Sequence, residues 1–251
     1  MNKVVYILYM CFVLSFLACG DENKSEFQTI FNGENLDGWK GDRTYWRVEN
    51  GNLVGEVTPE TILKRNTFII YKKQVPTNFE LKLEYKISES GNSGVNYRSE
   101  IMEKFPNALK GYQCDIDGKN RYTGQNYEEK KRTTLAYIGE KVMIPQMGDA
   151  IIKGDLRKNV KKNCWQTRTI LEVQDKTQLK SNIKLNDWNE VHLKIQGDKL
   201  QHFINGVLFS EVNDLDTINR SLKGFLGVQV HVGPPMKVEY KNIKLKPLKD
   251  N

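Results

Sequence analysis

Three short stretches carry the side chains best suited to chemistry, and each alternates between apolar or small residues and polar ones. They cover residues 94–100, 111–117 and 227–233. Because side chains along a β-strand point alternately to opposite faces, each stretch should present one polar face. The polar side chains expected there are Asn96, Arg98, Glu100, Gln113, Asp115, Asp117, Gln229 and His231. Amides, an arginine, three acids and a histidine without any lysine predict a ligand-binding groove.

The alternate residues of the same stretches should face a hydrophobic core. They are Val95, Tyr97, Tyr112, Cys114, Ile116, Val228, Val230 and Val232. A fourth stretch, residues 79–87, alternates just as regularly, but its polar members are Lys and Glu. That strand should have an ordinary solvated outer face, and the contrast sets the first three stretches apart.

His231 is the candidate base of this polar face, because an imidazole with a pKa near 6.5 transfers protons readily near neutral pH. Glu100 or Asp115 could donate a proton, and Arg98 could stabilise a developing negative charge. A single histidine in a strand can equally be a structural hydrogen-bond partner. Arg98 and Glu100 can equally pair with each other, or one of them with Asp117.

The elements that must position these groups are short strands joined by tight turns. Asn50-Gly51 and Asn205-Gly206 separate apolar runs, which is a strong hairpin signal. Residues 237–246 form a last strand, and no long segment has helical periodicity. The pattern predicts an antiparallel β-sandwich of the jelly-roll kind.

Residues 120–162 form a long, basic segment that alternates poorly and directly follows the acidic strand. Long loops in compact domains are usually functional or disordered. We expect this segment to be a lid or wall over the groove that brings Tyr127 and Tyr137 to a sugar. The alternative is a solvated excursion.

The N-terminus predicts export. Lys3 precedes an apolar run over residues 4–17, and Leu17-Ala18-Cys19 has the form of a lipoprotein cleavage site. The run is short for a membrane span of about 20 residues. We expect a signal peptide at 1–18, lipidation of Cys19, a tether at 19–26 and one domain at 27–251. The protein would then be anchored by lipid to the cell envelope, at the periplasm or the outer-membrane face; a plain signal peptide or a marginal anchor is the alternative.

The charge of the chain and the context in which it would fold argue against nucleic acid as a partner. The net charge is +7, with basic residues scattered along the sequence, and an exported lipoprotein has little access to nucleic acid.

Of four cysteines, Cys114 and Cys164 would remain in the folded domain, either as a disulfide or as buried thiols. No Cys/His spacing indicates zinc. A calcium ion at Asp115 and Asp117 is conceivable from their oxygen ligands, but we expect no metal or other cofactor.

The chain as a whole resembles the bacterial 3-keto-disaccharide hydrolases, also described as 3-keto-glucoside lyase/hydratase domains. The resemblance covers roughly residues 27–247. It rests on motifs that occur in order at residues 31–39, 46–51, 92–95, 111–113, 188–190, 227–231 and 240–243. It implies a concanavalin A-like lectin/glucanase jelly-roll β-sandwich that cleaves glycosides already oxidised to a ketone at C3.

A ketone at C3 acidifies the hydrogen at C2, so a base can remove it and the group at C1 can then leave by elimination. Under this resemblance His231 is the base, Glu100 or Asp115 the acid, and Arg98 stabilises the enolate or holds a hydroxyl. The expected substrate-binding residues are Asn96, Gln113, Asp117, Gln229, Tyr127 and Tyr137. No cofactor is required.

Two other functions stay open. A non-catalytic carbohydrate-binding lipoprotein would use the same groove without cleaving the sugar. A conventional glycoside hydrolase would use Asp115 and Asp117, since retaining enzymes place two carboxyl groups about 5–5.5 Å apart.

Overall fold

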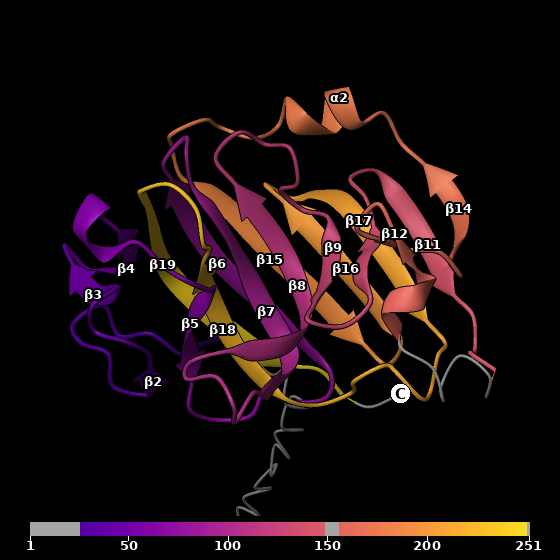
Figure 1. Cartoon of the computed structure of the whole chain (residues 1–251), viewed down its shortest axis with the longest axis horizontal. Helices are drawn as coiled ribbons and strands as arrows, with labels where there is room; N and C mark the ends of the chain where they lie inside the picture. Colours follow the sequence, from indigo (N-terminus) through magenta and orange to yellow (C-terminus); the bar gives the residue numbers. More distant parts are fainter. Residues whose placement is uncertain (1–25, 149–155, 250–251) are drawn as a thin grey trace, which may run out of the picture.

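The protein is a sandwich of two large β-sheets stacked face to face (Figure 1). The computed structural model describes residues 26–148 and 156–249. The expected signal peptide at 1–18, the lipidation site Cys19 and all but the last residue of the tether lie outside the described residues. The prediction of an all-β jelly-roll sandwich is confirmed.

The first sheet has ten strands in the order β14-β11-β17-β16-β15-β6-β19-β4-β3, with β1 paired to β19. Its strands are β14 (Thr169–Val173), β11 (Glu140–Ile144), β17 (Val207–Asp214), β16 (Lys199–Ile204), β15 (Asn189–Gln196), β6 (Phe79–Ile87), β19 (Met236–Pro247), β4 (Asn52–Val57), β3 (Trp46–Glu49) and β1 (Gln28–Thr29).

The second sheet has nine strands in the order β12-β13-β10-β9-β8-β7-β18-β5-β2. They are β12 (Val160–Lys161), β13 (Cys164–Trp165), β10 (Thr133–Ala136), β9 (Asn126–Glu129), β8 (Leu109–Asp117), β7 (Asn92–Ile101), β18 (Phe225–Val230), β5 (Thr67–Tyr71) and β2 (Trp39–Lys40). The three stretches singled out in the sequence are adjacent here, as β8, β7 and β18.

Within the described residues, the helical elements are short and lie outside the sheets. They are η1 (Pro59–Thr61), η2 (Leu156–Asn159) and α2 (Lys176–Lys180). Across the two described ranges, no helix has the length and apolar character needed to cross a membrane.

The turns form where the sequence predicts them. Asn205 and Gly206 have φ values of 49° and 80° and connect β16 to β17. Asn50 and Gly51, at 52° and 78°, connect β3 to β4. These left-handed conformations suit Asn and Gly, whose strain there is small.

Alternation places the core as expected. In β6 the burial pattern alternates strictly, with Phe79, Leu81, Leu83 and Tyr85 buried between the sheets. Every expected core residue of the three stretches is buried except Val232, which is 40% exposed. Val232 does not follow the alternation because β18 ends at Val230, two residues before it.

Of the two alternatives left open for Cys114 and Cys164, the structure has the buried free thiols and not the disulfide. Cys114 lies on β8 and Cys164 on β13, which are three places apart in the sheet. Three strand spacings amount to about 14 Å, and a disulfide needs Cα atoms within about 7 Å.

The segment 120–162 is more regular than its sequence indicates, because it forms β9, β10, β11 and β12. Its strands extend both sheets beyond β8 and β17.

A buried ionic cluster between the sheets holds these added strands. Arg132 is fully buried; its Nε donates to Glu128 Oε2 at 2.5 Å and its Nη2 to Asp214 Oδ2 at 2.5 Å. Asp216 lies 3.6 Å from the same guanidinium, and the Tyr112 hydroxyl donates to Asp214 at 2.5 Å. Burial raises the pKa of Glu128, but Arg132 and Lys131 outweigh it and hold that pKa below its ordinary value. The cluster ties β9 and the start of β10 to β17 of the opposite sheet.

Replacing Arg132 with Met should destabilise the fold by about 3–5 kcal/mol, because it leaves the buried carboxylates of Asp214 and Asp216 without this counter-ion. Arg47→Met is the matched control. Arg47 also meets two glutamates but is 42% exposed, so its loss should cost about 0–1 kcal/mol. Urea unfolding of both variants measures the difference. Equal losses would contradict the structural role given to the cluster.

Candidate functional site

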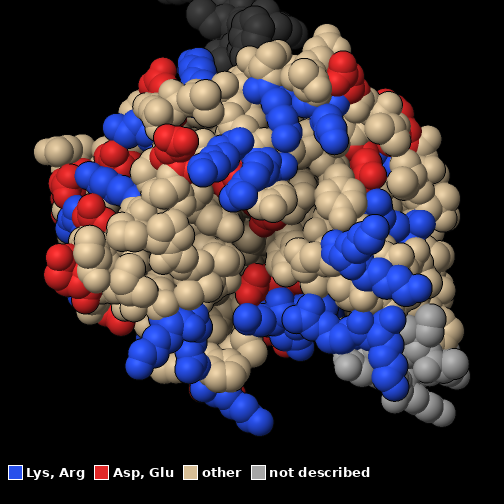
Figure 2. Space-filling view, turned by 45° about the horizontal axis from the view of Figure 1, so that its top comes forward, with Lys and Arg blue, Asp and Glu red and all other residues tan. Residues whose placement is uncertain are grey.

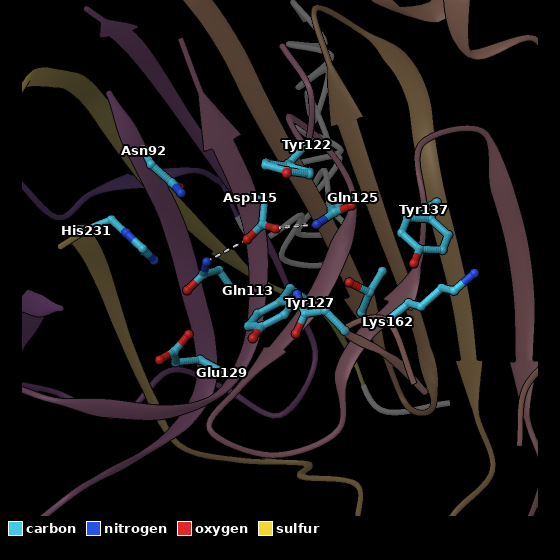
Figure 3. A pocket seen from close by; sticks show the side chains of 12 residues that line it. Asn92, Gln113, Asp115, Tyr122, Gln125, Tyr127, Glu129, Tyr137, Lys162 and His231 are labelled. Carbon is cyan, nitrogen blue, oxygen red and sulfur yellow. Dashed lines mark hydrogen bonds between the residues drawn. The ribbon is translucent and has the colours of Figure 1, made fainter. Parts of the chain in front are cut away.

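A pocket of about 330 Å³ opens on the outer face of the nine-stranded sheet, over β8 and β9 (Figure 3). Its size lies at the lower end of the range for small-molecule sites. The lining residues are Asn92, Gln113, Asp115, Tyr122, Gln125, Tyr127, Glu129, Thr134, Tyr137, Lys162, Asn163 and His231.

Strand alternation and register bring the central residues of the pocket together. Gln113 and Asp115 are alternate residues of β8, and their intervening neighbour Cys114 points into the core. Gln113 stands opposite Tyr127 of β9, so these two side chains share the outer face. Asn92 begins β7 on the other side of β8, two residues before Gly94, which stands opposite Asp115.

The Asp115 carboxyl group lies at the centre of the pocket between two amides (Figure 3). Gln113 Nε2 donates to Oδ1 and Gln125 Nε2 donates to Oδ2, each at 2.6 Å. Burial raises the pKa of Asp115 to about 7, against the opposing effect of these two donors. A carboxyl group that titrates near neutral pH can give up a proton or accept one during catalysis.

His231 faces Asp115 across the pocket, beside Asn92 (Figure 3). It follows β18 directly, and its Nδ1 lies 2.6 Å from the carbonyl oxygen of Val232. A carbonyl oxygen can only accept, so Nδ1 carries the hydrogen and Nε2 of the neutral ring keeps its lone pair. This tautomer suits a general base.

Three tyrosines form the remaining walls. Tyr122 follows the turn after β8, Tyr127 lies on β9, and Tyr137 follows β10. Burial, with Glu129 and Asp115 nearby, raises the pKa of Tyr127 to about 12. Burial and the Cys164 thiol raise that of Tyr137 to about 12. Both hydroxyls therefore stay neutral, and the rings offer apolar faces suited to packing against a sugar.

Asn96 of β7 and Gln229 of β18 lie on the expected face of the sheet but do not line the pocket. Gln229 is fully buried, and its Nε2 donates to Gln113 Oε1 at 3.4 Å. Asn96 is also fully buried and stands opposite Gln113 in the β7–β8 register. Both are therefore closed off beside Gln113 on the neighbouring strands, which corrects their expected role as substrate-binding residues.

The expectation that Arg98 joins the site is wrong. A bulge between Tyr97 and Glu100 interrupts the β7–β8 register, and Arg98 takes a left-handed conformation with φ of 45°. Its guanidinium donates to the backbone carbonyls of Thr77 at 2.6 Å and Gly197 at 2.7 Å. Arg98 therefore holds loops together and cannot stabilise charge in the pocket.

Glu100 and Asp117 also lie elsewhere. Glu100, beyond the bulge, is exposed and pairs with Lys110 at 3.4 Å. Asp117 is buried, where it accepts from the Tyr122 backbone N–H at 2.8 Å and Arg121 Nε at 3.3 Å. It shapes the turn that carries Tyr122 and Gln125, and it does not line the pocket.

The two aspartates of the conceivable calcium site have different surroundings, since Asp115 lines the pocket and Asp117 does not. Protein N–H donors occupy both oxygens of Asp115 and both of Asp117. Within residues 26–148 and 156–249, no three His, Cys, Asp or Glu side chains are grouped to bind a metal.

Sequence reasoning missed seven lining residues: Asn92, Tyr122, Gln125, Glu129, Thr134, Lys162 and Asn163. Asn92 could have been found by extending the alternation of residues 94–100 by one step. Glu129 follows Tyr127 at strand spacing, but β9 has only four residues, too few for its alternation to stand out. The others come from turns and short strands that close around Asp115.

The fold and the site together define a jelly-roll β-sandwich with a polar pocket, centred on a buried carboxyl group, on the outer face of one sheet. The sequence matches the 3-keto-alpha-glucoside-1,2-lyase-like domain family over residues 26–246, and the chain belongs to that family. The family resemblance read from the sequence is confirmed.

Relatives agree with this placement. A 3-keto-disaccharide hydrolase of Bacteroides thetaiotaomicron is 24% identical over 238 residues, which are 88% of this chain and 78% of the relative. Together with the family, this relative points to a glycoside-cleaving hydrolase or lyase.

Solved structures share the fold. One protein of Parabacteroides distasonis, described as a glycosyl hydrolase, has a TM-score of 0.56 at 22% identity, covering 89% of this chain and 94% of its own. A Bacillus subtilis protein with a galectin-like fold has a TM-score of 0.54 at 9% identity, covering 86% and 92%. A Bacillus subtilis carbohydrate-binding module (CBM66) has a TM-score of 0.50 at 12% identity, covering 83% and 95%.

The Gln113 amide should lower the pKa of Asp115, because it donates to the ionised carboxylate. In Gln113→Leu the pKa of Asp115 should rise from about 7 by about one unit, which corresponds to the loss of one hydrogen bond to a charged group. A carboxyl ¹³C NMR titration measures it. Gln201→Leu is the control, since Gln201 donates to Glu211 on the other sheet at 2.6 Å and should leave Asp115 unaffected. An unchanged or lowered pKa in Gln113→Leu would show that the amide does not act on Asp115.

Proposed function

We propose that this protein cleaves glycosides whose sugar carries a ketone at C3, by elimination or net hydrolysis. The observation that carries the proposal is the buried Asp115 carboxyl group, with a pKa raised to about 7, facing His231 across one pocket. Family membership and the Bacteroides relative supply the 3-keto substrate class.

In the proposed reaction, Nε2 of His231 removes the proton from C2, and the C2–H electrons form an enolate with the C3 ketone. The enolate then collapses to a C1–C2 double bond, restores the ketone and breaks the bond from C1 to the glycosidic oxygen. Protonated Asp115 gives its proton to that oxygen, so the leaving group departs as a neutral alcohol. Addition of water across the double bond, with hydroxide at C1 and a proton at C2, completes a net hydrolysis.

The remaining lining residues would orient the sugar. Asn92 lies beside His231 and is the donor that takes over the enolate-stabilising role expected of Arg98. Gln113 and Gln125 fix the carboxyl group of Asp115. Tyr122 and Tyr127 would pack against the ring.

Asp115→Asn should lower kcat on a 3-keto-glucoside by about 10²–10⁴-fold, the usual loss when a general acid or base is removed. Glu100→Gln is the matched control, because Glu100 is an exposed carboxylate on the neighbouring strand, outside the pocket. Release of methanol from the methyl 3-keto-glucoside, whose leaving group must be protonated, measures both. Full turnover by Asp115→Asn would remove Asp115 from the mechanism.

The pH dependence has a defined sign. Asp115 must be protonated to act as the acid, so kcat/KM should fall as the pH rises through about 7. This fall in kcat/KM with rising pH should be smallest when the leaving group is 4-nitrophenol, which leaves without protonation. It should be largest with an alkyl leaving group.

The same assay separates the two alternatives. The carbohydrate-binding module among the structural neighbours favours sugar binding without cleavage as the second candidate function. That reading predicts binding of the glycoside with no release of its leaving group. A conventional hydrolase would cleave the unoxidised glucoside, but its expected pair is not assembled, because Asp117 lies outside the pocket.

We further propose that the chain is exported and anchored by a lipid on Cys19, from the apolar run at 4–17 and the Leu17-Ala18-Cys19 site. Cys19→Ser should move the protein from the membrane fraction to the soluble fraction, because the acyl chains that anchor it are no longer attached. Immunoblotting of the two fractions measures this. A wild-type chain found only in the soluble fraction would refute the anchor.

A further inference from the structure

The cations around the pocket differ from those on the ten-stranded sheet. On that sheet Lys82, Lys86, Lys237, Lys241 and Lys246 each pair with a glutamate within 4 Å. Lys162 lines the pocket, Lys161 precedes it, and Lys119 lines an adjoining hollow that shares Asn92 and His231 with the pocket. All three are exposed, and none has a carboxylate partner in the described parts of the chain.

Figure 2 shows one face of the surface, with Lys and Arg side chains around a hollow and acidic side chains within it. Arg121 also lines the adjoining hollow, but Asp117 lies 3.3 Å from it and offsets its charge, and Glu89 lies on the same wall. Lys162 is thus the cation that lines the pocket itself and has no carboxylate partner among the described residues.

The backbone at Lys162 is strained. Lys162 and Asn163 form the turn between β12 and β13 with φ values of 49° and 58°. Such a turn favours Asn-Gly, and lysine tolerates a left-handed conformation poorly. A strained residue at the edge of a pocket is a reason to look for a function of its side chain.

The proposed reaction fixes which end of the substrate meets Lys162. His231 must contact C2 and Asp115 the oxygen on C1, so the leaving group extends from Asp115 away from His231. Figure 3 shows Tyr137 and Lys162 on that side, opposite His231 and Asn92. Glu129 also lines the pocket, but it pairs with Lys130 at 3.5 Å.

We propose that the pocket prefers glycosides whose leaving group carries a carboxylate or sulfate-like anion, bound by Lys162 at the outer end of the site. This rests on the proposed function, which supplies the orientation of the substrate. An exposed ammonium without a competing carboxylate provides selectivity at the rim while Asp115 acts at the centre.

The test uses 3-keto-glucosides of 4-hydroxyphenylacetate and of its neutral amide, which differ by one charge far from the reacting bond. The wild type should prefer the anion about fivefold in kcat/KM at low salt, the upper end for an exposed ion pair, and lose the preference in 0.5 M NaCl, where the Debye length is only a few Å. Lys162→Met should bring the ratio close to one, and Lys162→Arg should restore it. Lys194→Met should leave the ratio unchanged, because Lys194 is an exposed lysine on the other sheet.

The 4-hydroxyphenylmethanesulfonate glucoside distinguishes a carboxylate site from a sulfate site.

Calorimetric binding of the same glycosides separates this inference from the proposed function. A salt-dependent preference in binding without any cleavage would support the anion site and refute the enzyme. Cleavage of both substrates at equal rates, or a preference that survives in Lys162→Met, would overturn the anion site and leave the enzyme intact.

Discussion

Burial of one carboxyl group, that of Asp115, is the constraint on which the rest of the pocket depends. An isolated buried carboxylate is costly, so its surroundings must either keep it protonated or supply hydrogen bonds to the charged form. Here the two demands nearly balance, because burial raises the pKa and the two glutamine amides lower it. Asp115 therefore gains and loses its charge near neutral pH, whereas a solvated aspartate stays ionised there.

That burial is produced by elements added to one side of the sandwich. The turn after β8 and strand β9 bring Tyr122, Gln125 and Tyr127 over Asp115, and Asp117 ties the turn to the strand from below. Strand β9 is in turn fastened to the opposite sheet through the Arg132 cluster. The outward side chains of β9 therefore line the site. Its inward side chain Glu128 binds Arg132 and so holds the strand that carries them.

Strand alternation made much of this predictable from the sequence. It gave the outward positions of Gln113, Asp115 and His231 and the inward positions of their neighbours, and the Asn-Gly pairs gave the hairpins. It failed at Arg98 because a bulge changes which way residues point without changing the residue pattern. The only sign lies in partners remote in sequence: a Cβ at Gly111 or Gly224 would stand 2.6 Å from atoms of Ser99 or Arg98, so glycine is required on both sides of the bulge. The closure of 120–162 over Asp115 was expected only in outline, because strands of two to five residues are too short to show a period.

The proposed mechanism depends on removal of the proton at C2 of a 3-keto sugar in this pocket. Exchange of that hydrogen in D₂O tests it directly with 1,5-anhydro-3-keto-glucitol, which has no leaving group at C1, so proton removal is observed without cleavage. The wild-type protein should accelerate loss of the C2–H signal in the ¹H NMR spectrum well beyond the rate in buffer, and His231→Gln should abolish the acceleration. A bound ligand that exchanges no faster than in buffer, or equally fast exchange in His231→Gln, would contradict the proposed mechanism.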